Sequence, residues 1–172
     1  MSKVVITCFE PFGGRATNAS KEVVSLLNGY QIKELPVSWS KVPLLLDELF
    51  VNEPDYLFLI GEAGSYKEIT AEQVAHNISN GKDNEGVNKD NEAIIVGDKE
   101  VKTTLFDLSN IPYHISDNAG KYLCNYSYYL ALSKAKTCKV LFIHLPYIEE
   151  SGPNSLDNLK NDLLNIIETL AK

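Results

Sequence analysis

Residues 55–60, D-Y-L-F-L-I, form a short apolar run, and a glycine-containing loop, G-E-A-G-S-Y, follows them directly. A short, continuous apolar run that ends in glycine is typical of a strand buried on both faces. Such strands belong to largely parallel sheets, because helices cover both sides of these sheets. The run therefore predicts a central strand of an α/β protein.

Two similar runs occur, one near the start of the chain and one towards its end. Residues 3–8, K-V-V-I-T-C, and residues 139–144, K-V-L-F-I-H, combine β-branched and apolar side chains as buried strands do. A further strand is expected at residues 31–37. Cap residues and apolar periodicity predict helices at residues 18–27, 40–51, 123–135 and 155–170.

The middle of the chain is less regular. Residues 68–78 fit a strand or a helix, and their β-branched side chains favour a strand. Residues 79–91 are polar and contain glycine, which predicts a surface loop. Residues 93–106 predict a hairpin around a Gly-Asp pair, and residues 114–116 predict a short strand.

The alternation of strands and helices predicts an α/β protein with a three-layer α/β/α sandwich, a mostly parallel (mixed) central sheet and a single domain over residues 1–172. The formal net charge of -7 argues against nucleic acid or an anionic membrane as the main partner, because both require a basic surface. A strand begins without the apolar region of a signal peptide, so a cytoplasmic protein is expected.

The three cysteines, Cys8, Cys124 and Cys138, form no C-x-x-C pair, so neither a disulfide framework nor a zinc site is signalled, and no cofactor is expected. Cys8 and Cys138 lie in strand patterns and are interpreted as buried thiols. Cys124 follows the loop S-D-N-A-G and begins a predicted helix. Unpaired N–H groups and the helix dipole stabilise a thiolate there, so Cys124 is either a reactive thiol or a small buried hydrophobe.

A cysteine nucleophile needs a base that exchanges protons with it and a third group that orients the base. In open α/β sheets the ligand binds at the carboxyl ends of the strands. His144 closes the last apolar strand, where it is either this base or a structural histidine. His76 lies in a predicted strand and His114 precedes one, so both are interpreted as structural.

Four motifs occur in order along the whole chain. F-E-P-F-G-G occupies residues 9–14, and Asn18 follows it. The other three are G-x-x-G-(x)4-I-T-x-E-x-V-A-x-N at residues 61–77, S-x-N-A-G-x-Y-x-C-N at residues 116–125 and F-I-H-x-P-Y at residues 142–147. Together they make the sequence resemble the pyroglutamyl peptidase I family, also called pyrrolidone-carboxylate peptidases. This is a family of cytosolic cysteine peptidases that remove an N-terminal pyroglutamyl residue.

The resemblance implies a catalytic triad. Cys124 would attack the carbonyl after the pyroglutamyl ring, His144 would shuttle the proton, and Glu72 would orient and stabilise the imidazolium. The substrate partner would be a peptide with N-terminal pyroglutamate. Family members often form dimers or tetramers, so a homo-oligomer is also compatible with the resemblance.

The same resemblance places four side chains in the substrate pocket. Pyroglutamate is a flat, neutral lactam, so its recognition requires apolar faces and one or two amide hydrogen bonds. Phe9 and Phe12 would form the ring pocket with Asn18 hydrogen-bonding nearby, or the two phenylalanines are core residues beside a tight turn. Glu62 is assigned to the pocket as well, at a position where relatives usually have glutamine.

Several arginines of the family are missing. Relatives usually have arginine where Tyr66 and Gln73 stand, and a third arginine, before D-N-E-G, is replaced at best by Lys82. Arg15 is the only arginine of the chain. Less positive charge and a carboxylate at Glu62 would oppose a thiolate. Three hypotheses stay open: a pyroglutamyl peptidase, a related cysteine hydrolase with another substrate, and an inactive member that binds a peptide or partner.

Overall fold

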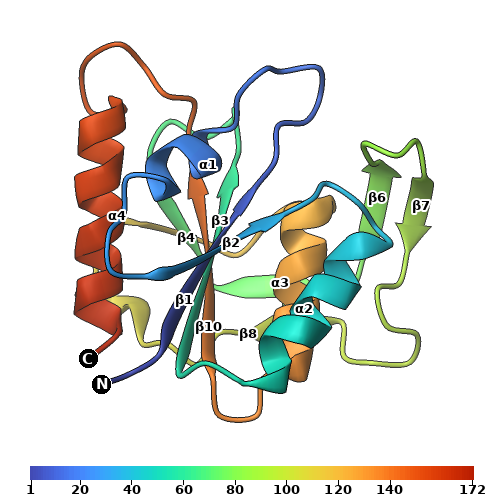
Figure 1. Ribbon diagram of the computed structural model, residues 1–172. Helices are drawn as coiled ribbons and strands as arrows, with labels where there is room; N and C mark the ends of the chain where they lie inside the picture. The colour runs from blue at the N-terminus through green and yellow to red at the C-terminus, as the bar shows by residue number, and fades with distance from the viewer.

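A six-stranded sheet forms the middle layer of the computed structural model, which describes all 172 residues (Figure 1). In order across the sheet, its strands are β2 (Gln31–Leu35), β1 (Val4–Phe9), β3 (Tyr56–Glu62), β10 (Lys139–Leu145), β4 (Thr70–Glu72) and β9 (His114–Ser116). Every neighbouring pair is parallel except β10 and β4, which are antiparallel. The sheet is therefore mixed and mostly parallel, as predicted.

Four α-helices cover the two faces of the sheet in pairs (Figure 1). One face carries α1 (Ala19–Val24) and α4 (Leu156–Leu170), and the other carries α2 (Lys41–Val51) and α3 (Leu123–Lys134). A short 3-10 helix, η1 (Leu108–Asn110), precedes β9. Each face has its own cluster of 20 buried hydrophobic residues, which confirms the predicted sandwich. None of the helices combines the length and the apolar character needed to cross a membrane.

The position of β3 between two layers of helices explains why its sequence is apolar without interruption. Leu57 and Leu59 belong to the cluster under α2 and α3, whereas Phe58 and Ile60 belong to the cluster under α1 and α4. Successive side chains of a strand point to opposite faces, so a strand covered on both sides needs apolar residues at every position. The predicted strand is confirmed, and it continues through Glu62 into the expected loop.

The expected loop at residues 79–91 is wrong. These residues form an antiparallel hairpin of β6 (Ser79–Lys82) and β7 (Asn88–Glu92), which stands beside the main sheet at one side of the molecule (Figure 1). Most of its side chains are exposed, so its strands need no apolar residues at alternate positions. A hairpin of this kind resembles a loop in its sequence.

The expected hairpin at residues 93–106 is also wrong. Its second half contains β8 (Val101–Thr103), which pairs with β5 (Val74–His76) and not with the residues that precede it. The strand prediction for residues 68–78 is confirmed, but the segment is divided between β4 in the main sheet and β5 in this small sheet. Pairing with a distant segment leaves no local sequence pattern.

One carboxylate ties the end of α2 to the start of β10. Glu53 Oε1 accepts hydrogen bonds from the N–H groups of Lys136, Thr137 and Cys138, at 2.8, 2.9 and 2.9 Å. We expect Glu53→Ala to lower the free energy of unfolding by about 1–3 kcal/mol, because three donors lose one charged acceptor. Urea denaturation measures the change. Replacement of the exposed Glu150 by alanine is the control, and equal stability of both variants would contradict this role of Glu53.

Candidate active site

The carboxyl ends of β1, β3 and β10 meet at one edge of the sheet, which is where open α/β sheets bind ligands. The parallel register aligns the last residues of β3 and β10: His144 lies opposite Gly61, and Leu145 lies opposite Glu62. Strand β1 ends at Phe9, where the F-E-P-F-G-G loop begins. Three motifs that are distant in the chain are therefore brought to one place.

Cys124 reaches this edge from the first turn of α3, as predicted. Its sulfur packs on the backbone of β3 at Gly61, where an added Cβ atom would lie 2.8 Å from Sγ and 2.6 Å from the Phe142 ring. Any larger residue at this glycine would therefore displace the thiol. Helix α3 begins at Leu123 without a side-chain cap, so its first N–H groups are free to bind a ligand.

A buried hydrogen bond joins His144 to Glu72. Nδ1 of the imidazole lies 2.8 Å from Oε1 of the carboxylate, and both side chains are almost completely enclosed. A carboxylate can only accept, so Nδ1 carries the proton and Nε2 is the nitrogen that can exchange one. The antiparallel pairing of β4 with β10 creates this contact, because it sets Glu72 opposite Phe142, the neighbour of His144 on the same face of β10.

Tyr66 makes a second contact with the same carboxylate oxygen, which the sequence did not indicate. Its hydroxyl donates to Glu72 Oε1 at 2.6 Å and also lies 3.0 Å from the Asn118 carbonyl and 3.3 Å from Ser116 Oγ. The tyrosine ring meets the His144 ring edge-on, with centroids 5.3 Å apart. Tyr66 therefore links the glutamate, the histidine and the loop before α3. A tyrosine in a polar loop gives no local signal of such a role.

Burial, hydrogen bonds and neighbouring charges shift the pKa values of Glu72 and Cys124. For Glu72, burial opposes ionisation, but hydrogen bonds from His144 and Tyr66 prevail and hold the pKa of the carboxyl below its usual value. Burial, followed by the charges of Glu72 and Glu62, raises the pKa of the Cys124 thiol to about 12. The expected stabilisation of a thiolate by the helix terminus is therefore outweighed in this structure.

One open pocket of about 260 Å³ is lined by both Cys124 and His144. Its chemically distinctive lining residues are Cys124, His144, Phe12, Glu62, Lys121, Tyr122 and Tyr147. The Cys124 sulfur makes no hydrogen bond to the imidazole of His144. Among Cys124, His144 and Glu72, only the histidine and the glutamate are hydrogen-bonded to each other. The predicted nucleophile and base share a cavity, and the glutamate lies behind the base.

The structure separates the four residues that were predicted to bind substrate. Phe12 and Glu62 line the pocket. Phe9 does not reach it, because its ring is buried in the hydrophobic cluster under α2 and α3. Asn18 is buried as well and caps α1, accepting from the Ser20 N–H at 3.0 Å and donating to the backbone of the β1–α1 loop. Contact of Phe9 or Asn18 with a substrate stays a prediction.

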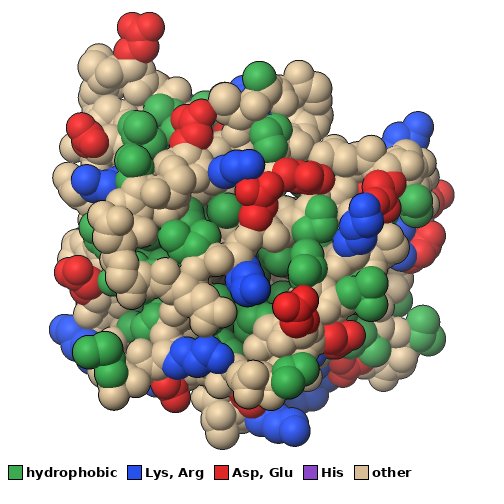
Figure 2. Space-filling model, viewed as in Figure 1, with side chains coloured by type: hydrophobic (Ala, Val, Ile, Leu, Met, Phe, Trp, Pro, Cys, Tyr) green, Lys and Arg blue, Asp and Glu red, His purple; other side chains and the backbone are tan.

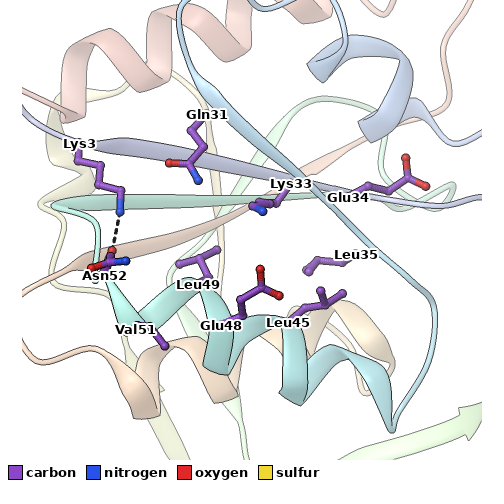
Figure 3. Close-up of a pocket in the computed structure, with 10 residues that line it drawn as sticks. All are labelled: Lys3, Gln31, Lys33, Glu34, Leu35, Leu45, Glu48, Leu49, Val51 and Asn52. Carbon is purple, nitrogen blue, oxygen red and sulfur yellow. Dashed lines mark hydrogen bonds between the residues drawn. The ribbon is translucent and has the colours of Figure 1, made fainter.

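Another hollow of the surface has a different chemical character. It lies between β2 and α2 and has a volume of about 320 Å³ (Figure 3). Lysine, glutamate, amide and aliphatic side chains line it, without cysteine or histidine, and Lys3 donates to the Asn52 carbonyl at one end. Acidic and basic side chains are interspersed on this face of the molecule (Figure 2). No group of three or more His, Cys, Asp or Glu side chains is placed to hold a metal ion.

Sequence and fold both match known proteins over nearly the whole chain. A family model described as pyroglutamyl peptidase matches residues 2–158. The pyrrolidone-carboxylate peptidase of Fusobacterium nucleatum subsp. nucleatum is 35% identical over 190 residues, which cover 98% of this chain and 89% of the relative. That of Thermosipho africanus is 36% identical over 208 residues, with 99% and 97% covered.

Two solved structures show the same fold. The pyrrolidone carboxyl peptidase from Thermococcus litoralis has a TM-score of 0.87 at 26% identity and covers 99% of this chain and 94% of its own. The pyroglutamyl peptidase I from Bacillus amyloliquefaciens also has a TM-score of 0.87, at 29% identity, with 99% and 95% covered. With a family model that spans most of the chain and relatives above 30% identity along its whole length, the chain belongs to the pyroglutamyl peptidase family of cysteine omega-peptidases.

Proposed function

We propose that this protein removes an N-terminal pyroglutamyl residue from peptides by cysteine catalysis. The single observation that carries the proposal is the buried His144–Glu72 hydrogen bond beside Cys124 in one pocket. Nucleophilic catalysis requires these three parts: a nucleophile, a base, and a group that orients the base. Membership of the family supports pyroglutamyl peptides as the substrate class.

The first half of the reaction transfers the pyroglutamyl group to the protein. Nε2 of His144 takes the proton of the Cys124 thiol, and Sγ attacks the carbonyl carbon after the pyroglutamyl ring. The imidazolium then gives this proton to the leaving amine as the C–N bond breaks. Glu72 stays ionised and stabilises the imidazolium through Nδ1, in agreement with its lowered pKa.

The second half hydrolyses the thioester. His144 takes a proton from water, the oxygen attacks the thioester carbonyl, and the Cys124 sulfur leaves and regains the proton from the imidazolium. The net reaction adds one water across one amide bond. Backbone N–H groups in the first turn of α3 are the candidates to bind the oxyanion in both halves, and one such donor contributes about 2.7–4 kcal/mol.

The pocket suits a flat ring without charge. Phe12 and Tyr147 offer aromatic surfaces. The one buried carboxylate, Glu62, is already paired with Arg15 Nε at 3.1 Å and with the Ala19 N–H at 2.7 Å. Because this charge is balanced inside the protein, the pocket does not require a charged group on its ligand.

A second hollow, of about 360 Å³, adjoins this pocket and shares His144 with it. Its far side is formed by Tyr66, Ser116 and Asn118. The base must reach the amine that leaves, so we assign this hollow to the peptide that follows the pyroglutamyl residue.

A cysteine hydrolase with another N-terminally modified substrate is the second candidate. It is favoured by the buried Glu62 carboxylate among the residues that line the pocket. This alternative predicts rapid alkylation of Cys124 by iodoacetamide without turnover of a pyroglutamyl amide. An inactive binding protein would show neither turnover nor rapid alkylation of Cys124.

Turnover of a chromogenic substrate tests the main proposal. We expect the protein to release nitroaniline from pyroglutamyl-p-nitroanilide at pH 7, with a reductant that reproduces the expected cytoplasmic setting. Cys124→Ala should lower kcat/KM by at least about 10³-fold, because it removes the nucleophile. Prolyl-p-nitroanilide, which carries a charged amine in a ring of similar size, is the matched control and should react poorly. No release from the pyroglutamyl substrate would refute the proposal.

The orienting role of Glu72 gives a separate prediction. Glu72→Gln should lower kcat by about 10²–10⁴-fold with little change in KM, because a neutral amide stabilises the imidazolium poorly and permits the wrong tautomer of His144. Tyr66→Phe removes only one hydrogen bond to this carboxylate and should lower kcat by about tenfold. Steady-state kinetics on correctly folded variants measure both effects. An unchanged kcat for Glu72→Gln would exclude it from the triad.

A further inference from the structure

The β1–α1 loop places one guanidinium between two partners at the pocket mouth. Arg15 Nε lies 3.1 Å from Glu62 Oε1, and the guanidinium carbon lies 3.9 Å from the centre of the Tyr147 ring. The Arg15 side chain is 37% exposed, whereas the Glu62 side chain is 2% exposed. The arginine therefore covers a buried carboxylate and stacks on an aromatic ring with its other side.

Glu62 depends on Arg15 for charge compensation. Its second oxygen, Oε2, accepts the N–H of Ala19 at 2.7 Å, so both oxygens are occupied. Arg15 provides its only ion pair. A carboxylate this deeply buried is costly unless it is paired, and here it lines the same pocket as Cys124.

Arg15 also belongs to the turn that carries a pocket residue. Its N–H donates to the Phe12 carbonyl at 3.3 Å, across Gly13 and Gly14, which have φ of +65° and +75°. Two glycines in the left-handed region make this turn easy to deform, because glycine has many accessible conformations. An anchored Arg15 side chain therefore restricts where Phe12 stands.

Tyr147 brings a third segment to the same arginine. Its ring lies on the backbone of Gly64, where an added Cβ atom would be only 2.2 Å from the ring. Tyr147 belongs to the segment between β10 and α4, and Gly64 follows β3. Through its ion pair with Glu62 and its contact with Tyr147, Arg15 connects the β1–α1 loop to the end of β3 and to the segment between β10 and α4.

We propose that Arg15 is a positioning residue of the pocket, which neutralises Glu62 beside Cys124 and holds the Phe12 turn against Tyr147 so that an uncharged ring is accepted. The substrate part of this inference rests on the proposed function. The effect on the cysteine does not, because it follows from the charge of Glu62 and the position of Arg15.

The electrostatic effect acts on the thiol. The charged and titratable groups around Cys124 come from every element packed on it: Glu62 of β3, Glu72 of β4, His144 of β10, Tyr66 of the β3–β4 loop, and Lys121 and Tyr122 before α3. Without Arg15, the charge of Glu62 would oppose the thiolate more strongly. Glu62→Gln would remove this opposition and keep an oxygen that can accept the Ala19 N–H.

Alkylation of Cys124 by iodoacetamide, followed against pH by mass spectrometry of its peptide, tests this effect without any substrate. We expect the midpoint to move up by at least about half a pH unit in Arg15→Ala and down by a similar amount in Glu62→Gln. The double variant, Arg15→Ala with Glu62→Gln, should not show the upward shift of the alkylation midpoint that Arg15→Ala causes alone. Lys21→Ala, which removes the exposed Lys21–Glu34 ion pair, is the matched control and should leave the profile unchanged.

Steady-state kinetics test whether Arg15 holds the turn that carries Phe12 in place. Arg15→Ala should raise KM for pyroglutamyl-p-nitroanilide at least about fivefold, with a smaller change in kcat at the optimal pH. Arg15→Lys keeps the charge but cannot stack as a planar fork, so it should restore the alkylation profile and only part of KM. Wild-type alkylation and wild-type KM in Arg15→Ala would overturn the inference. A shifted alkylation profile in a protein that does not cleave the substrate would support the Arg15–Glu62 effect and refute the proposed function.

Discussion

The parallel pairing of β3 with β10 determines where the residues of the pocket meet. Seven consecutive residues of the two strands are in register, so both strands end at the same edge of the sheet. Gly61, Glu62 and His144 arrive there together. Because Gly61 has no side chain, the Cys124 sulfur fits against the backbone of β3. One strand pairing thus places His144 and the pocket carboxylate Glu62 and leaves space for the thiol.

The buried hydrogen bonds among Glu72, His144 and Tyr66 fix the orientation of these side chains more than they stabilise the fold. Removing Glu72 and His144 from water costs several kcal/mol. Their mutual hydrogen bond and the Tyr66 hydroxyl offset part of this cost, but both reach Oε1 of Glu72, and the buried Oε2 has no hydrogen-bond partner. The benefit is a single orientation of the imidazole, because a carboxylate that can only accept fixes which ring nitrogen carries the proton. The apolar layers on both sides of β3 and β10 keep this pair enclosed.

Cys124 shows how burial, together with whole charges, outweighs a helix terminus. The positive end of a helix corresponds to about half an elementary charge spread over several N–H groups. Burial and the full negative charges of Glu72 and Glu62 act in the opposite direction and raise the pKa of the thiol. Both effects favour the neutral thiol over the thiolate. Under the proposed function, the His144–Glu72 pair must therefore take the proton of this thiol.

The layered fold and the place of Cys124 in the first turn of α3 were predictable from the sequence, because continuous apolar runs are stable only between two layers of helices and because a helix pattern follows the S-D-N-A-G loop. The sequence also indicated which strand ends meet. Three features became visible in the folded chain alone: β5 pairs with β8, Phe9 faces the core, and Arg15 covers Glu62. These contacts join segments with no common periodicity, so they depend on strand order and on packing, which a local pattern of residues does not encode.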